Sequence, residues 1–370
     1  MTMEFPCKAA NIYDKNVNFL FGSGASALYI PTLWLDEDTT YETLLTEEAC
    51  KEVKDFILCS YYNNIIRRSF CTNPIRNINN FKITSKNYKD FVSELISLLE
   101  KKGSHQIRRS NIFTTNYDLF FENAADHALE STSFHFNDGA LGFKKRRLSI
   151  SNFHITSWHQ GTHDMYKHEL PTINLIKMHG SVSWNRDEKQ NINIDYPRDK
   201  PKRFLLESEK SINNLVKALN ETDEDLVQFL ELSDNDINTL KDFTSYYRSL
   251  AIVNPTKEKF SETVFQQHYY QSLRLLSYEL EKPQTVLICF GFSFQDEHIL
   301  EIIKRSLSNP TLKVFVFCYN LSSKDKISST INDPRITFIH PRQTEHTIGF
   351  EEFIKRIFTS EAGDWITWTN

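Results

Sequence analysis

Short apolar runs that end in small or polar residues constrain the fold of this chain more than any other feature. They are rich in β-branched and aromatic residues, and they are nearly continuous rather than alternating with polar residues. That pattern is typical of strands buried on both faces of a parallel sheet. The runs lie at residues 17–21, 111–115, 173–178, 285–290, 313–318 and 336–339.

The segments between these runs are long and show helical spacing of their apolar residues, which indicates a mixed α/β chain. We therefore predict a Rossmann-like parallel sheet with helices on both faces and sizeable helical insertions. Three or four helices are expected between residues 209 and 281. The clearest helical patterns lie at 41–70, 86–102, 254–280, 296–307 and 351–358.

A single domain of residues 1–370 accommodates this pattern, since that length suffices for one large α/β domain with insertions. We interpret residues 36–110 and 185–282 as the helical insertions. Residues 131–170 differ, because apolar and polar residues alternate there and Asp138-Gly139 offers a turn. A β-hairpin or an extended flap is expected in that segment.

The charge of the chain argues against nucleic acid and membranes as partners. Its formal net charge is −5, so it has no overall attraction to polyanions. We interpret the basic run 144–147 as a solvated loop and expect no direct nucleic-acid binding. No apolar run reaches the roughly 20 residues that a membrane-spanning helix needs. No signal peptide is visible, and we expect a cytoplasmic protein.

The six cysteines form no recognisable metal motif. No two of them have C-x-x-C spacing, so we predict neither zinc nor any other metal site. Four histidines crowd the flap segment, but no cysteine or carboxylate motif accompanies them. Cys289 and Cys318 lie in apolar runs and are expected to be buried, reduced thiols.

The first candidate functional segment is a glycine turn. Gly22, Ser23, Gly24, Ala25 and Ser26 follow a predicted strand directly. Small side chains would let backbone N–H groups approach a pyrophosphate, and a following helix would direct its positive end at the phosphates. Such a turn by itself is weak evidence, because it also suits a tight connection between a strand and a helix.

A polar cluster follows the second run, at Thr115, Asn116 and Asp118. The Asn116 amide can donate and accept hydrogen bonds, so it could hold a water molecule or a ribose hydroxyl. Asp118 precedes an apolar stretch that is expected to be helical. It is either a functional carboxylate or the cap of that helix, and the sequence leaves both interpretations open.

Three further strand ends complete the candidate site. His179 directly follows the third run, where an imidazole is placed to act as a general base. Gly291 and Ser293 follow the fourth run, and Ser293 could reach a phosphate or a ribose. Asp296 is expected near a helix start, while Asn320, after the fifth run, could contact a ribose hydroxyl. Ligands of parallel α/β sheets bind outside the carboxyl ends of the strands, where all of these residues fall.

These residues, in this order, resemble the motifs of the sirtuin superfamily. The segment Thr115-Asn116-Tyr117-Asp118 is similar to a Gln-Asn-x-Asp signature, with Thr115 in place of Gln. The resemblance implies that residues 22–26 hold the NAD pyrophosphate, that Asn116 approaches the nicotinamide ribose, and that His179 is the catalytic histidine. Gly291-Phe292-Ser293 resembles a Gly-Thr-Ser turn that contacts the cofactor, and Asn320 matches a ribose-binding asparagine.

Two departures narrow the activity that the resemblance implies. Protein-deacylating sirtuins carry a four-cysteine zinc module, which this chain cannot form, and a Pro-Asp-Phe-Arg segment, where this chain has Ile30-Pro31-Thr32-Leu33-Trp34. The chain is instead similar to sirtuin-like NADases of bacterial antiphage defence. Its compact size most resembles the sirtuin-like subunit that assembles with a HerA-type ATPase. The resemblance thus implies NAD as substrate, a homo-oligomer and that ATPase as partner.

We expect hydrolysis of NAD to nicotinamide and ADP-ribose. Asn116 would orient a water molecule, His179 would accept a proton, and Asp118 would orient Asn116 or cap its helix. An NAD-dependent acyl or ADP-ribosyl transferase would keep the cofactor site and use another acceptor. A non-catalytic NAD or ADP-ribose sensor is the other alternative, and the presence of both Asn116 and His179 argues against it.

Overall fold

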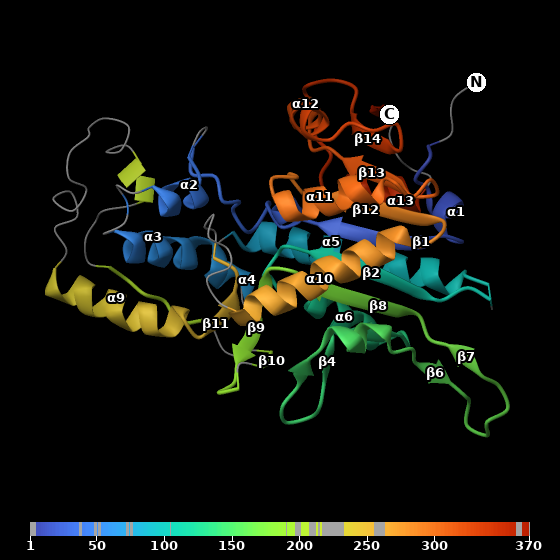
Figure 1. Cartoon of the computed structure of the whole chain (residues 1–370), viewed down its shortest axis with the longest axis horizontal. Coiled ribbons are helices and arrows are strands. Elements are labelled where there is room, and N and C mark those ends of the chain that lie inside the picture. Colours follow the sequence, from blue (N-terminus) through green and yellow to red (C-terminus); the bar gives the residue numbers. More distant parts are fainter. Residues whose placement is uncertain are drawn as a thin grey trace.

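The computed structural model of the chain describes most of its 370 residues. Figure 1 shows how their elements are arranged. The described residues are 5–36, 39–47, 50, 53–71, 74, 77–103, 105–189, 191–196, 201–206, 212–213, 215–216, 233–254, 263–359 and 365–369.

An eight-stranded sheet forms the centre of the molecule. Its strands β3 (His135–Asn137) and β15 (Ile366–Thr369) lie at the two edges. All neighbouring strands are parallel except β14 and β15. The predicted α/β, Rossmann-like fold class is therefore confirmed. The six apolar runs form β1 (Asn16–Phe21), β2 (Arg109–Thr114), β8 (Thr172–Lys177), β12 (Thr285–Phe290), β13 (Lys313–Phe317) and β14 (Ile336–Pro341).

The strand order places a natural ligand crevice beside β1. The sheet runs β15-β14-β13-β12-β1-β2-β8-β3. The chain therefore builds outward from β1 in one direction through β2 and β8, and in the other through β12, β13 and β14. In such doubly wound sheets, ligands bind at the carboxyl ends of the strands where the two directions part. Here those ends are followed by Gly22 and by Gly291.

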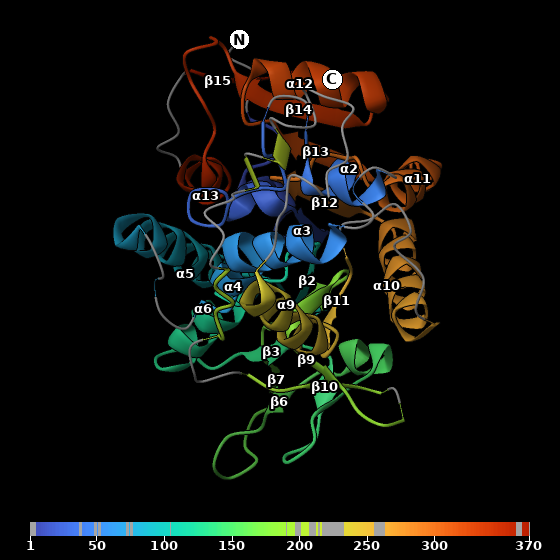
Figure 2. The ribbon, with the colours of Figure 1, turned by 90° about the vertical axis from the view of Figure 1, so that its left-hand side faces the viewer.

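Helices cover both faces of the sheet, as Figure 2 shows. One face carries α5 (Ile78–Glu100), α6 (Phe120–Leu129) and α13 (Phe350–Phe358), and the other carries α10 (Thr263–Glu281), α11 (Glu297–Ser306) and α12 (Leu321–Thr330). Successive residues of β1 explain why its apolar run is continuous. Phe19 and Phe21 are buried in the layer that contains α5, α6 and α13, which we call the first layer, and Leu20 is buried in the layer that contains α10, α11 and α12. Both faces of the strand are therefore apolar.

Aromatic side chains hold the first layer against β1 and β12. Phe91 of α5 contacts Phe19 and Phe21 edge to face, with ring centroids 5.0 and 5.1 Å apart. Phe353 of α13 lies 4.5 Å from Phe290 at the end of β12. Each such pair stabilises the fold by about 0.5–1.5 kcal/mol beyond its burial. The strand ends that precede the two glycine turns are therefore rigidly packed.

The segment 36–110 contains a core helix and a peripheral helical group. Its longest helix, α5, is the crossover between the parallel strands β1 and β2 and packs on the sheet. The peripheral group packs on α9 (Asp234–Tyr247), with Tyr62 5.8 Å from Phe243 between ring centroids. The members of this group are α2 (Tyr41–Thr46), α3 (Lys54–Tyr61), a π-helical turn (Tyr62–Ile66) and α4 (Arg67–Ser69).

A second, five-stranded sheet was not expected from the sequence. It is antiparallel and follows the order β11-β9-β10-β5-β4. One of its strands, β11, interrupts the segment 209–281, for which only helices were predicted. Much of the remainder of that segment lies outside the described residues, including residues 255–262 of the helix expected at 254–280, of which Asn254 is described and is not helical. The strands are β4 (Ala140–Leu141), β5 (Arg147–Leu148), β9 (Gly180–Arg186), β10 (Ile192–Ile194) and β11 (Leu250–Ile252).

Residues 131–170 contain two hairpins that project from the body of the molecule (Figure 1). In one, β4 pairs with β5, and in the other β6 (Trp158–His159) pairs with β7 (His168–Glu169). A 3-10 helix (Ile150–His154) connects them. Large apolar side chains are exposed on these hairpins, among them Phe143, Met165 and Tyr166.

The described residues also show the state of the cysteines, the absence of membrane-spanning helices among them and the absence among them of clustered metal ligands. All six cysteines are free and buried, which confirms the expectation for Cys289 and Cys318. No described helix is both long enough and apolar enough to span a membrane. In the same part of the chain, no group of three or more His, Cys, Asp or Glu side chains is placed to hold a metal ion.

Candidate functional site

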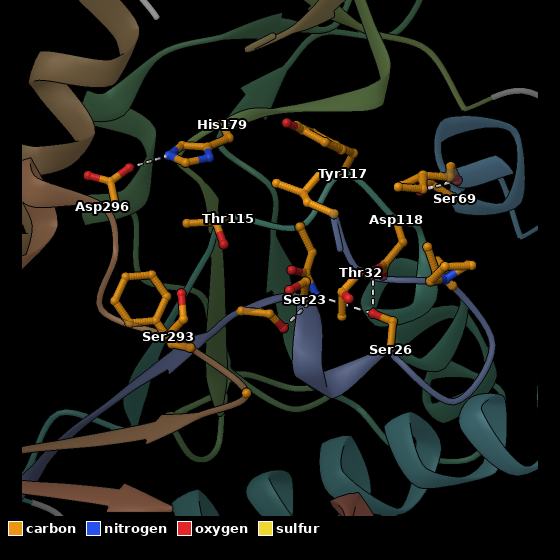
Figure 3. A pocket seen from close by; sticks show the side chains of 18 of the residues that line it. Ser23, Ser26, Thr32, Ser69, Thr115, Tyr117, Asp118, His179, Ser293 and Asp296 are labelled. Carbon is orange, nitrogen blue, oxygen red and sulfur yellow. Dashed lines mark hydrogen bonds and ion pairs between the residues drawn. The ribbon is translucent and has the colours of Figure 1, made fainter. Parts of the chain in front are cut away.

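A cavity opens at the carboxyl ends of β1, β2 and β12 (Figure 3). Its empty volume is about 890 Å³, part of which is open to solvent. The turns after the strands form one wall, and the segment Ile30–Leu33 with the peripheral helices forms the other.

Most of the predicted site residues meet in this cavity. Its wall includes Gly22, Ser23, Ser26, Thr115, Asn116, Asp118, His179, Gly291 and Ser293. Gly24, Ala25 and Asn320 are not among the lining residues. Asn320 caps α12, because its Oδ1 accepts a hydrogen bond from Ser323 N at 2.8 Å. The predicted residues therefore gather around one cavity, but their sequence pattern does not distinguish those that line it from those that do not.

The glycines of the two turns are needed where backbone packs on backbone. A Cβ atom on Gly22 would lie 2.4 Å from the carbonyl oxygen of Gly291, and one on Gly24 would lie 2.6 Å from Gly291 Cα. Gly291 itself has φ +65°, which favours glycine. The glycine-rich sequence therefore brings the ends of β1 and β12 into contact at the floor of the crevice.

The turn after β1 differs from the helix that was predicted to follow it. It is a single 3-10 turn, Ser23–Ala25. The side chain of Ser26 is tied into the core, and Pro31 follows, which has no N–H for a continuing helix. No full helix dipole is therefore aimed at the cavity from this turn.

The N–H groups of this turn are also less available than expected. Gly22 N donates to Phe290 O at 3.1 Å, and Gly24 N donates to Gly291 O at 3.0 Å. The amides of Ala25 and Ser26 close the 3-10 turn itself. Within the described residues, Ser23 is the one position from 22 to 26 whose N–H has no recorded acceptor. A phosphate at this turn would therefore meet Ser23 rather than a row of N–H groups.

Asn116 is fixed by its own amide. Its Nδ2 donates to the carbonyl oxygen of Gly22 at 3.0 Å and to Ser26 Oγ at 3.2 Å. These two acceptors settle which end of the amide is nitrogen. The remaining oxygen, Oδ1, is the part of this side chain that is left to bind a ligand, so Asn116 faces the cavity as a hydrogen-bond acceptor.

Asp118 makes contacts both to the start of a helix and, through a serine, to the Asn116 amide. Its Oδ2 accepts the hydroxyl proton of Ser26 at 2.6 Å, and its Oδ1 accepts from Phe120 N at 3.3 Å, in the first turn of α6. Burial raises the pKa of the Asp118 carboxyl above its ordinary value of 3.8. Asp118 therefore secures a helix start and, through Ser26, the amide of Asn116.

A buried ion pair lies behind Asp118. Lys177, the last residue of β8, forms a salt bridge with Glu122 of α6 at 2.7 Å, and both side chains are buried. Lys177 Nζ also donates to the carbonyl oxygen of Asp118 and to Ser181 Oγ. The pair joins β8 to α6 beneath the cavity. Sequence analysis missed it, because Lys177 lies inside an apolar run.

His179 occupies a sharp connection between β8 and β9. The next residue, Gly180, has φ +87°, and a Cβ there would lie 2.2 Å from Ala251 O. The carbonyl oxygen of His179 accepts from Val253 N at 2.9 Å, next to β11. The second sheet therefore holds the backbone of His179, while its ring projects into the cavity (Figure 3).

The ring of His179 has a carboxylate partner that the sequence did not predict. Its Nε2 lies 3.1 Å from Asp296 Oδ2. Asp296 was expected only to start a helix, and it does cap α11, with Oδ1 accepting from Ile299 N at 3.2 Å. Tyr269 of α10 donates its hydroxyl proton to the same Oδ1 at 3.1 Å. The only sequence signal for this cluster was the position of Asp296 after a strand-end glycine.

The wall opposite the strand ends was also missed. Ile30, Leu33, Tyr61 and Ile65 give it an apolar surface, and Glu42 adds a carboxyl group. Tyr61 and Ile65 lie in the segment 41–70, for which a helical pattern was predicted, and both are buried. Their place on the cavity wall depends on how the peripheral helices pack, which helical spacing does not reveal.

The cavity is acidic. Among the described residues that line it, Glu42, Asp118 and Asp296 carry carboxyl groups, and none is Lys or Arg. Charges interact more strongly at a partly buried site than in water, so this lining favours a ligand part with positive charge. The hydroxyls of Ser23, Thr115 and Ser293 provide neutral donors for an anionic part.

Comparison with known families agrees with this geometry. Residues 110–339, which are more than half of the chain, match the SIR2-like domain. The protein belongs to the SIR2-like domain family. SIR2-like domains bind NAD, and the family supports an NAD-related enzymatic function for this member. Along the chain the match runs from within β2 to within β14 and includes Asn116 and His179, while β1 and the turn 22–26 precede it. A search among curated proteins found no match.

Proposed function

We propose that this SIR2-like protein is an NAD⁺ glycohydrolase that cleaves NAD⁺ to nicotinamide and ADP-ribose. The observation that carries the proposal is the meeting of Asn116 and His179 in one cavity, at the point where the two directions of the sheet part. The cavity suits this substrate, because its serine and threonine hydroxyls can bind phosphate and ribose oxygens. Its carboxylates favour the positively charged nicotinamide ring.

The reaction makes two demands on the protein. The bond between ribose C1′ and the nicotinamide nitrogen breaks, and its electron pair leaves with nicotinamide. The oxygen of a water molecule then bonds to C1′ and gives up a proton. Asn116 Oδ1 accepts a hydrogen bond from that water or from a ribose hydroxyl, and the imidazole of His179 accepts the proton.

The proposed roles predict a large loss of rate when either side chain is removed. We expect the purified protein to release nicotinamide from NAD⁺, and chromatography measures the rate of that release. Removing a positioned general base lowers the rate by about 10² to 10⁴, so His179→Ala should fall in that range. Asn116→Ala should be similarly impaired. Asn123→Ala on α6 provides a control, because Asn123 does not line the cavity.

The same experiment separates hydrolysis from its alternatives. Nicotinamide release that persists in folded His179→Ala would contradict the role of His179. Release that requires an added acyl-lysine or protein acceptor would replace hydrolysis by group transfer. Binding of NAD⁺ with no release, both alone and with a candidate ATPase, would replace it by a sensor.

We also propose that the protein depletes NAD in the cytoplasm as part of antiphage defence, and that assembly controls it. The resemblance to sirtuin-like defence NADases supports this role, and a HerA-type ATPase is the partner it implies. Exposed apolar side chains on the two hairpins, Phe143 and Met165 among them, are of the kind that mark protein interfaces.

Assembly can be tested separately from activity. We expect light scattering to show a homo-oligomer at micromolar concentration and a larger complex when a HerA-type ATPase is added. Addition of the ATPase should also change the rate of nicotinamide release, measured by chromatography. A monomer whose mass and activity do not respond to that ATPase would contradict the assembly proposal and leave the hydrolase proposal intact.

A further inference from the structure

We propose that Asp296 is a positioning residue that holds the neutral imidazole of His179 as its Nε2–H tautomer, so that Nδ1 accepts the proton. The inference rests on the proposed hydrolase function for the identity of that proton. The contacts that carry it are independent of the substrate. They come from three separate segments: the connection between β8 and β9, the helix α10 and the start of α11.

The tautomer follows from what Asp296 can do. A carboxylate accepts hydrogen bonds and does not donate them. Nε2 of His179 lies 3.1 Å from Asp296 Oδ2, so in the neutral ring the hydrogen is on Nε2. The lone pair is then on Nδ1. Among the described residues, Nδ1 has no recorded hydrogen-bond partner, and His179 lines the cavity.

Asp296 is itself held in place by two donors. The hydroxyl of Tyr269 and the backbone N–H of Ile299 both bind Oδ1, at 3.1 and 3.2 Å. The first oxygen is therefore used for structure, and the second, Oδ2, is directed at His179 (Figure 3). The carboxylate and the imidazole are largely buried, with side-chain exposures of 6% and 12%.

The tyrosine packs against the same histidine. The rings of Tyr269 and His179 have centroids 5.7 Å apart, and Tyr269 is almost completely buried. The imidazole is thus confined by a ring on one side and by a carboxylate at Nε2. A base that is held in one orientation and one tautomer before substrate arrives need not reorganise during the reaction.

The substitution Asp296→Asn isolates this role. Asparagine is as good an N-cap as aspartate, and its carbonyl oxygen can still accept from Tyr269. Its NH₂ group, however, would face Nε2. The ring must then accept at Nε2 and carry its hydrogen on Nδ1, which leaves no lone pair on the atom that faces the substrate. Asp296→Ser also preserves a cap but presents nothing to Nε2, so it tests the same role if the asparagine variant does not fold.

The decisive measurement is the ring ¹⁵N spectrum of His179 in the full-length protein, assigned by its absence in His179→Ala. We expect the Nε2–H tautomer in the wild type and the Nδ1–H tautomer in Asp296→Asn. The rate constant for nicotinamide release should fall about 10- to 100-fold. Affinity for ADP-ribose, measured by calorimetry, should stay close to that of the wild type. Asp296→Ser should lose less rate than Asp296→Asn, because its ring is free to adopt either tautomer.

The outcomes distinguish this inference from the hydrolase proposal. A wild-type ring with its hydrogen on Nδ1, or an unchanged rate in folded Asp296→Asn, would overturn the positioning role. If the wild type releases no nicotinamide but its tautomer still switches in Asp296→Asn, the positioning role stands and the hydrolase proposal fails. Equal losses of rate and of ADP-ribose affinity in both variants would indicate collapse of the cavity and would also overturn it.

Discussion

The two sides of the cavity are built differently. On one side, Asn116, Ser26, Asp118 and Tyr88 form what we call the asparagine cluster, and all four are buried. Ser26 Oγ connects them, since it donates to Asp118 and accepts from Asn116 and, at 3.0 Å, from the hydroxyl of Tyr88. On the other side, the histidine cluster consists of His179, Asp296 and Tyr269, with Asp296 as its centre.

The difference shows what each side offers to a ligand. In the asparagine cluster both donor bonds of the Asn116 amide go to protein acceptors, so only its oxygen remains. In the histidine cluster, Asp296 takes Nε2 of His179, so only Nδ1 remains. Both clusters therefore present an acceptor to the cavity. The group that they bind together must be a donor, which suits a water molecule or a hydroxyl better than a carbonyl.

The largest effect on stability is expected at the buried ion pair that lies beneath both clusters. Lys177 binds Glu122 and the backbone carbonyl of Asp118. Because Lys177 is also only two residues before His179, it supports both sides of the cavity. Lys177→Met leaves a buried carboxylate without its partner, which should lower the free energy of unfolding by about 3–5 kcal/mol, measured with urea. The double variant Lys177→Met/Glu122→Leu should recover much of that loss. A loss below about 1 kcal/mol in Lys177→Met alone would show that the ion pair contributes little to the free energy of unfolding.

A matched pair of hydroxyl deletions ranks the two clusters directly. Ser26→Ala removes a bridge among three buried partners and leaves Asp118 short of a donor, so it should cost about 1–3 kcal/mol in urea unfolding. Tyr269→Phe removes one donor from Asp296, whose Oδ1 keeps Ile299 N, and should cost about 1 kcal/mol. The reverse order would mean that the histidine cluster is the more rigid side.

The pH dependence of stability should separate the buried carboxyl of Asp118 from an ordinary surface one. Burial raises the pKa of Asp118 above 3.8, so the folded protein holds this proton more tightly than the unfolded chain does. Its contribution to stability is complete below the unfolded pKa and is lost as the pH rises from about 4 through the raised value. Asp118→Asn should remove that decline. Relative to the wild type, the variant should gain unfolding free energy across this range.

Asp333→Asn is the control for that measurement. The guanidinium of Arg335 donates to Asp333 and lowers the pKa of this carboxyl below 3.8. Its contribution is therefore present above the unfolded pKa and is lost as the pH falls, so the variant should differ in the opposite direction. Parallel pH profiles for the two variants would contradict the burial argument.

The smallest effect is expected at Asn320, which lies outside both clusters. Loss of its cap on α12 in Asn320→Ala should cost about 1 kcal/mol of unfolding free energy, measured by urea denaturation. The KM for NAD⁺ should change little. A large rise in KM would support the ribose contact predicted from the sequence and would place part of the NAD⁺ site outside the two clusters.

Much of the asparagine side was predictable, because its signals are local. Strands buried on both faces appear as continuous apolar runs, and Gly22 and Asn116 directly follow two of them. In a parallel sheet the carboxyl ends of the strands lie at one edge, so these residues were expected to lie near one another. The turn after β1 was less predictable, since the hydrogen bonds of Gly22 and Gly24 go to β12 and its turn, far away in the sequence.

By itself, then, the sequence determined the parallel sheet, six of its eight strands and the positions of their polar ends, since burial and turn chemistry act over a few neighbouring residues. Only the tertiary structure decided that Asp296 serves His179 and that Tyr269 serves Asp296, because these contacts join segments 117 and 27 residues apart. A carboxylate at a helix start looks the same in sequence whether it merely caps the helix or also orients a base. Asp296 Oδ2 reaches His179 only when folding of the sheet brings the end of β8 close to the start of α11.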